Sequence, residues 1–205
     1  MPRTKRGSLE TRRERVLEVA QVLFAERGYH NTTMDEIASR SGIGKGTLYR
    51  TFPTKEMLFL ATLERAMARL ERAILSEVER EPTVLGKLRR AAGLYFRFFE
   101  QEGELFKILA SNVPTLQEHF RKRVQDKYSF YVDQIASMLR EGIKRGEIRP
   151  VGRPESITVA LIGACNSMIY NWLLSGKPYP LEEDLKLIER AIAGMAAPAF
   201  PSGSE

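Results

Sequence analysis

A short stretch beginning at Thr33 constrains the fold more than any other part of the chain. Thr33 and Glu36 have the spacing of a capping box, which predicts a helix that starts there. Gly42 ends this helix, because glycine can adopt the left-handed conformation that a tight corner requires. A second short helix is predicted from Gly44 to Phe52, and Pro53 stops it by pushing the preceding residue out of helical geometry. Two short helices joined by a glycine turn form a helix-turn-helix.

The outward face of the second short helix indicates contact with nucleic acid. Its side chains are of the types that hydrogen-bond to phosphates and base edges: Lys45, Thr47, Tyr49, Arg50 and Thr51. Small Ala38 suits a close crossing of the two helices, and Ile43 and Leu48 are expected to point inward. A plain helical corner has the same spacing, so the functional interpretation depends on the residue types of the outer face.

The run from Gly28 to Glu56 resembles the DNA-binding signature of the TetR family of bacterial transcriptional regulators. The matching pieces are Gly28-Tyr29, Thr33, Ile37-Ala38, Gly42-Ile43, Gly46-Thr47-Leu48-Tyr49, Phe52 and Lys55-Glu56. The resemblance implies a dimeric, ligand-responsive regulator, most simply a repressor. Many members carry His or another ring where this chain has Thr51, so no base contact is carried over to that position.

The DNA-binding residues predicted from this stretch are Thr33, Lys45, Gly46, Thr47, Tyr49, Arg50 and Lys55. Thr33, Tyr49 and Lys55 are expected to meet phosphates, together with backbone amides at helix starts. Lys45, Thr47 and Arg50 are expected to face base edges in the major groove. Gly46 would let the backbone approach the DNA closely.

The charge of the chain is concentrated ahead of this motif. The net charge is +6, and residues 1–15 hold six basic against two acidic side chains. This distribution suits a polyanionic partner. Residues 1–8 are interpreted as a loose arm, which either touches the DNA backbone or minor groove or is a solubilising tail.

The rest of the chain predicts an all-α protein of about nine helices in two domains. Residues 1–53 form the DNA-binding domain, with a helix from Leu9 to Arg27 that Gly28 ends, and residues 54–205 form the helical effector-binding and dimerisation domain. Apolar periodicity predicts its helices over residues 54–80, 84–101, 105–110, 114–145, 155–175 and 181–195.

The last two predicted helices carry more apolar surface than one small bundle needs. Paired across a two-fold axis, they would form a four-helix dimer interface, with Leu187 and Ile188 near its centre. The alternative is that both helices belong to the core of a monomer. Gly163 and Ala164 are small enough for close helix contact in either arrangement.

An aromatic cluster in the second domain admits two interpretations, core packing or an apolar effector pocket with a few polar anchors. The candidate effector-binding residues are Phe96, Phe99, Phe106, Tyr128, Tyr131, Met138, Asn166 and Tyr170. The family resemblance implies a small-molecule effector. The segments Glu141–Ile148 and Asn171–Leu174 resemble members that sense fatty acyl-CoA, which makes acyl-CoA a candidate.

The sequence contains only weak signals for enzymatic, nucleotide-binding or metal-binding functions. Gly42–Thr47 resembles a phosphate-binding loop of a nucleotide-dependent enzyme, but Gly46 separates the lysine from the threonine and a helix is expected before it. No catalytic residue, metal ligand or cofactor is expected, so the chain is interpreted as a non-enzyme. Cys165 is expected to be a packing thiol, and Val159–Leu174 is too polar for a membrane span, which indicates a cytoplasmic protein. A DNA-binding protein or activator without a ligand remains the other alternative.

Overall fold

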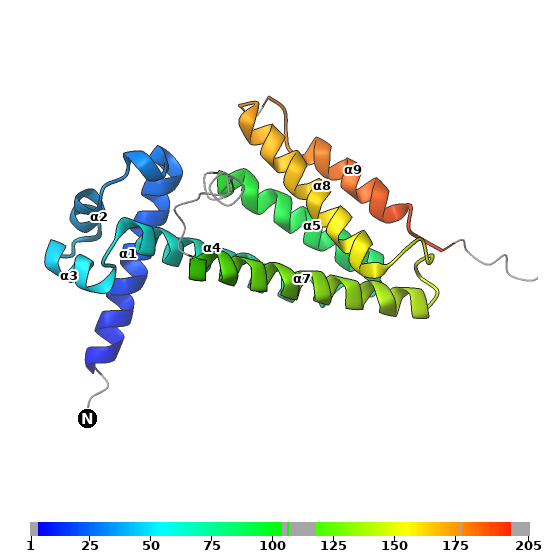
Figure 1. Cartoon of the computed structure of the whole chain (residues 1–205), viewed down its shortest axis with the longest axis horizontal. Helices are drawn as coiled ribbons and strands as arrows, with labels where there is room; N and C mark the ends of the chain where they lie inside the picture. The colour runs from blue at the N-terminus through cyan, green and yellow to red at the C-terminus, as the bar shows by residue number, and fades with distance from the viewer. Residues whose placement is uncertain (1–3, 104–105, 107–117, 177, 198–205) are drawn as a thin grey trace, which may run out of the picture. The chain divides into compact units, whose positions relative to one another are not determined.

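The computed structural model describes residues 4–103, 106, 118–176 and 178–197. These residues form an all-α fold with eight helices (Figure 1). The helices are α1 (Thr4–Asn31), α2 (Met34–Ser41), α3 (Lys45–Thr51), α4 (Lys55–Val78), α5 (Val84–Gln101), α7 (Glu118–Lys144), α8 (Pro154–Leu174) and α9 (Glu182–Ala193). The helix predicted over residues 105–110 lies outside the described residues, apart from Phe106.

The first helix begins earlier than the sequence predicts. The backbone is already helical from Thr4, so the prediction of a loose arm is wrong for residues 4–8. Gly28 has a non-helical backbone, with φ 76° and ψ 167°, so the first helical segment ends there as the sequence predicts, and a short further turn runs to Asn31. Glycine accommodates this positive φ without a steric penalty.

The chain divides into two compact units. The first comprises residues 1–69 and 102–116, and the second comprises residues 70–101 and 117–205. The division falls at Arg69 inside α4, so this helix contributes its first part to one unit and its last part to the other. The boundary predicted after residue 53 follows the helix-turn-helix instead and stays a prediction.

The first unit packs α1, α2 and α3 with the start of α4. Its core is formed by the apolar stripe of α1, which includes Leu23 and Phe24, together with Ile37 and Leu48; all four side chains are at most 1% exposed. The Phe24 ring meets Phe59 of α4 edge-on, with 5.0 Å between ring centroids. This core holds the two short helices of the motif in a fixed relation to α1 and α4.

The second unit contains α5, α7, α8 and α9, with α8 packed against the other three. Cys165, Ile169 and Trp172 of α8 are buried in its core. The Trp172 indole donates a hydrogen bond to the Tyr179 carbonyl at 2.6 Å, which ties the loop after α8 to the helix. Figure 1 shows α8 and α9 lying side by side at the end of the chain.

Two details of the second unit go beyond the sequence pattern. Ile148 and Ala196 form an isolated antiparallel bridge, closed by the hydrogen bond from Arg149 N to Met195 O at 2.9 Å. Among the described residues, one helix, α8, has the length and the apolar composition of a membrane span. Only 28% of that apolar window is buried by the chain itself, so α8 presents an apolar surface to its surroundings.

Candidate nucleic-acid interface

The turn between α2 and α3 forms as the sequence predicts. The Thr33 hydroxyl accepts a hydrogen bond from Glu36 N at 3.2 Å and so caps α2. Gly42 adopts the left-handed conformation, with φ 68° and ψ 28°, and its amide turns back to α2. Ala38 and Leu48 are 2% and 1% exposed at the helix crossing. The motif is therefore held together by contacts within the chain itself.

The helix α3 presents a polar and basic face to its surroundings. Lys45, Gly46, Tyr49 and Arg50 are exposed, and Thr47 is half-buried. Thr33 is also exposed, at the start of α2. The structure thus brings six of the predicted DNA-binding residues onto α3 and the adjoining start of α2.

Gly46 has no packing role within the chain. A Cβ added at this position would meet no other atom within 4 Å, and the residue does not have a positive φ. Glycine within a helix costs up to about 1 kcal/mol relative to alanine. Because neither internal space nor backbone conformation requires glycine here, the bare backbone is available for the close approach of an external partner.

Lys55, the remaining predicted DNA contact, is engaged within the protein. Its Nζ donates to the carbonyls of Tyr29 at 2.9 Å, Thr32 at 3.1 Å and His30 at 3.4 Å. It also lies over the Tyr29 ring, 4.4 Å from the centroid. Burial lowers the pKa of Lys55 below its usual value. This ammonium therefore fastens the end of α1 to the start of α4.

An acidic side chain that sequence reasoning missed lies beside α3. Asp35, in the first turn of α2, accepts a hydrogen bond from Lys45 Nζ at 2.6 Å. Both side chains are more than half exposed. The sequence places Asp35 in the first turn of α2 but gives no indication that it contacts Lys45, ten residues further on.

A basic side chain of α1 also reaches the motif. The Arg13 guanidinium lies over the ring of Phe52, 5.5 Å from its centroid, at the end of α3. Phe52 is 4% exposed, so this contact orders an arginine next to the helix-turn-helix. The side chains of Lys5 and Arg6 and all of Arg3 lie outside the described residues.

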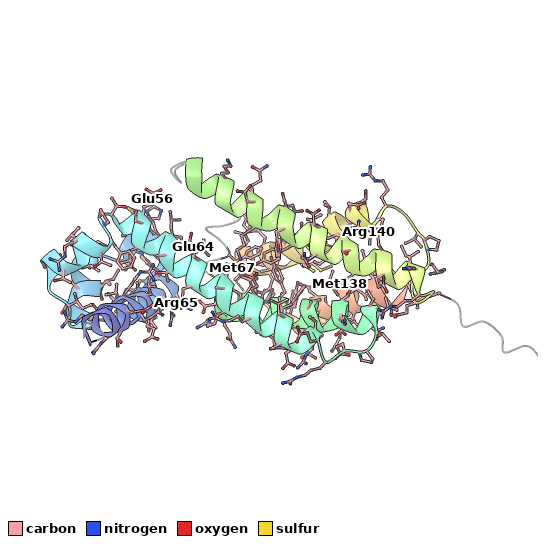
Figure 2. All side chains as sticks on the ribbon, turned by 90° about the horizontal axis from the view of Figure 1, so that it is seen from below. Glu56, Glu64, Arg65, Met67, Met138 and Arg140 are labelled. Carbon is pink, nitrogen blue, oxygen red and sulfur yellow. The ribbon has the colours of Figure 1, made fainter. Side chains whose placement is uncertain are left out.

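A polar network joins α1, α4 and the residue that follows α5 within the first unit. Glu102 is 8% exposed and accepts hydrogen bonds from Gln21 and, at 2.9 Å, from Arg69. Arg65 donates to Gln21 at 3.1 Å and to Glu14 at 2.8 Å. Figure 2 shows Arg65 on α4 facing α1. This network, which the sequence did not predict, ties α4 to the helix that supports the motif.

The predicted effector residues have different surroundings. Phe96 and Phe99 are 2% and 1% exposed, whereas Tyr128 is 40% exposed. Phe106 is buried and belongs to the first unit, whereas the other seven residues belong to the second. The intermediate positions are Tyr131, Met138, Asn166 and Tyr170.

A shallow depression of about 420 Å³ lies along α7, and its lining is polar or charged apart from Met138. The residues that line it are Gln134, Ser137, Met138, Arg140, Glu141 and Lys144. Met138 and Arg140 are labelled in Figure 2. This depression contains only Met138 of the predicted effector residues and differs from the apolar interior expected for the effector.

Asn166 has a partner that the predicted site did not include. The Tyr95 hydroxyl of α5 donates to Asn166 Oδ1 of α8 at 2.7 Å. Burial raises the pKa of Tyr95, so the phenol stays protonated, and burial raises the pKa of the Cys165 thiol to about 11. The polar groups in this part of the interior are therefore uncharged at neutral pH. The aromatic run of α5 pointed to packing but not to this hydrogen bond.

The geometry excludes a phosphate-binding loop at Gly42–Thr47. The segment joins α2 to α3, so a helix stands where such a loop needs a strand. In the part of the chain that the structure describes, no group of three His, Cys, Asp or Glu side chains is placed to hold a metal ion.

The fold and the exposed α3 define a helix-turn-helix regulator, and two family models match the chain. Residues 16–62 match the model for bacterial regulatory proteins of the tetR family, and residues 81–176 match the tetracyclin repressor-like C-terminal domain. The chain belongs to the TetR family of DNA-binding transcriptional regulators, whose members are not enzymes.

Relatives with curated names and solved structures agree with this assignment. The HTH-type transcriptional activator FasR of Mycolicibacterium smegmatis is 27% identical over 169 residues, which span 82% of this chain and 75% of FasR. A transcriptional regulator from Saccharomonospora viridis in complex with choline is 23% identical, with a TM-score of 0.81 and coverage of 91% and 98% of the two chains. FadR from Bacillus subtilis in complex with stearoyl-CoA is 20% identical, with a TM-score of 0.73 and coverage of 87% and 96%. At these identities the structural likeness concerns the fold.

Proposed function

We propose that this protein is a homodimeric, ligand-responsive repressor that binds a palindromic operator through α3 and is released from it by an amphipathic effector. The observation that carries the proposal is the capped α2, the Gly42 turn and the exposed face of α3 with Lys45, Tyr49 and Arg50. The rest of the chain does not cover these side chains, and they have the hydrogen-bonding groups that DNA recognition requires.

The residues of this interface have separate roles. Lys45, Thr47 and Arg50 read base edges, and Gly46 lets the backbone of α3 approach the groove. Thr33 and Tyr49 position the motif on phosphates. Lys55 stabilises the segment before α2, because its ammonium donates hydrogen bonds to the backbone carbonyls of Tyr29, His30 and Thr32.

The outer faces of α8 and α9 support a dimer. Val159 and Leu174 on α8 and Leu187 on α9 are 46%, 62% and 51% exposed. Gly163 is also exposed, and a Cβ added there would meet no atom of the chain within 4 Å, which leaves room for a second helix. Two copies paired through these helices would present two α3 helices to half-sites about one helical turn apart.

The effector is proposed to be a fatty acyl-CoA that enters the second unit beside Phe96, Phe99 and Asn166. The stearoyl-CoA complex of FadR, a distant structural relative, supports this class. A cytoplasmic location is part of the same proposal. The choline complex and the activator name of FasR support a different effector and activation as the second candidates.

A selection experiment tests the proposal. Random-sequence DNA duplexes are selected for binding to the full-length protein. The most enriched duplex is then titrated with the protein, with and without stearoyl-CoA, and its affinity is measured by fluorescence anisotropy. We expect a palindrome bound by two chains and at least tenfold weaker binding with stearoyl-CoA, because the effector favours the body conformation that does not fit the operator. Stearic acid and free CoA are the matched controls, and choline tests the second candidate effector. Selection without sequence enrichment would contradict DNA reading, and unchanged affinity with stearoyl-CoA would contradict the effector class.

A further inference from the structure

Asp35 is an acidic side chain placed on the surface that approaches DNA. It is exposed in the first turn of α2 and contacts Lys45, the first residue of α3, at 2.6 Å. The other acidic side chain of α2 is engaged elsewhere, since Glu36 contacts Arg27 at 2.7 Å and Arg40 at 3.5 Å. A carboxylate facing a polyanion lowers affinity unless a cation neutralises it. Its partner on this surface is Lys45.

We propose that Asp35 is a specificity-determining residue that acts by positioning Lys45, an inference that rests on the proposed function. A lysine ammonium has three donors on a flexible stem, and a free one binds any nearby phosphate. In this structure Asp35 accepts a hydrogen bond from the ammonium, which draws the Lys45 side chain toward α2 and leaves two donors for an external partner. Lys45 is then presented as a directed donor to a base acceptor, such as O6 or N7 of guanine.

The ion pair also reduces binding to DNA of the wrong sequence. Because the charge of Lys45 is compensated, this residue releases fewer counterions from the phosphate backbone than a free lysine would. Asp35 therefore weakens sequence-independent attraction while it preserves a base contact. Both effects raise the ratio of operator affinity to random-DNA affinity.

The test compares Asp35→Asn with the wild-type protein on the duplex that the wild type selects and on a scrambled duplex of the same length. We expect Asp35→Asn to bind the scrambled duplex about three- to tenfold more tightly at low salt. The slope of log affinity against log salt should steepen by roughly 0.9 per head, as one more phosphate is neutralised. The operator-to-scrambled ratio should fall by at least about fivefold, the lower limit for a lost base contact.

Two variants show that Asp35 acts through Lys45. Asp35→Glu keeps the carboxylate and should restore most of the ratio. In a Lys45→Ala background, Asp35→Asn should leave the ratio unchanged, because the side chain that it orients is missing. A change of ratio that persists in that background would overturn the positioning role and point to direct contact between Asp35 and a base.

Glu26→Gln controls for net charge. Glu26 is an exposed carboxylate of α1 whose side chain lies 3.8 Å from Arg40, so its removal changes the charge by the same amount. If Glu26→Gln lowers the ratio as much as Asp35→Asn does, the inference is wrong. If the wild-type protein selects no sequence, the proposed function fails and this inference falls with it. If it selects one and Asp35→Asn behaves as wild type, only this inference fails.

Discussion

At Gly46, a larger side chain is expected to stabilise the fold but to weaken DNA binding. A methyl group at this position would meet no atom of the protein within 4 Å. Gly46→Ala should therefore raise the free energy of unfolding by up to about 1 kcal/mol, because alanine is the better helix former. The same methyl group would lie between α3 and the DNA and should weaken operator binding by about 1 kcal/mol or more, the scale of one lost base contact.

The control for Gly46→Ala is Gly152→Ala, which also adds a methyl group in open space but lies in the loop before α8. Urea unfolding and anisotropy titrations of both variants give the two quantities. Undiminished operator affinity in Gly46→Ala would contradict the close approach of the DNA backbone to α3.

Lys55 makes contacts within the protein that the sequence did not predict. Removing its ammonium leaves the carbonyls of Tyr29 and Thr32 without this donor, so Lys55→Met should lower the free energy of unfolding by about 1–3 kcal/mol. Lys45→Met, which breaks an exposed ion pair, should change it by less than about 1 kcal/mol. The salt slope of DNA binding should stay the same in Lys55→Met. A stable variant with a slope reduced by about one would instead place Lys55 on a phosphate.

At the scale of the elements, Tyr95 joins α5 to α8 through its hydrogen bond to Asn166, and the burial of its phenol makes stability depend on alkaline pH. Burial raises the folded-state pKa of Tyr95 above its ordinary value of 10.0. The unfolded chain therefore loses the phenolic proton first, so stability is fully present below pH 10 and is lost as the pH rises through the folded pKa. The loss approaches about 1.4 kcal/mol per pH unit above 10.

Urea unfolding at pH 8 and at pH 11 tests this dependence. The stability difference between wild type and Tyr95→Phe should shrink or reverse at pH 11, because phenylalanine has no proton to lose. Tyr49→Phe, which removes an exposed phenol, is the matched control. A difference that is the same at both pH values would show that the Tyr95 hydroxyl is not shielded from solvent.

The two faces of α9 differ in exposure, which the sequence analysis did not resolve. The sequence placed both Leu187 and Ile188 at the dimer interface, but Ile188 is 3% exposed within its own subunit, whereas Leu187 is 51% exposed. The placement of Ile188 was wrong because Leu185, Ile188 and Ile192 form the inward stripe of the helix. Only the opposite face is open to a partner.

Single charges on the open face test the dimer without disturbing the core. Leu187→Glu and Val159→Glu should each give folded monomers in analytical ultracentrifugation, because a charge buried unpaired in an interface is costly. Each should also lose high-affinity binding to the palindrome. Exposed Leu75 of α4, changed to Glu, is the control and should stay dimeric. Dimers of normal strength in both interface variants would exclude these faces.

The elements with local signals were predictable from the sequence. Thr33, Gly42 and Pro53 act on their immediate neighbours, so α2, the turn and α3 follow from short-range rules. The contacts of Lys55 and Asp35 were not predictable, because they depend on how far a side chain reaches across a helix crossing. Periodicity identified α9 but not which of two adjacent residues faces inward.

At the scale of the whole molecule, the proposed recognition of an operator requires the two short helices and the proposed dimer to act together. One head contacts too few base pairs to be selective, and a pair related by two-fold symmetry doubles the number. Under this proposal, the relative affinity for operator and random DNA is a property of the dimer. It is also the quantity that depends most directly on the side chains of α3.

The ratio of operator to scrambled-duplex affinity in Lys45→Ala and Arg50→Ala is the most direct test of recognition through α3. Each variant should lose roughly 1–3 kcal/mol of discrimination while it remains a folded dimer with two chains per duplex. Measurements at several salt concentrations separate this loss from a general loss of phosphate attraction. A ratio equal to that of the wild type in both variants would contradict recognition through α3.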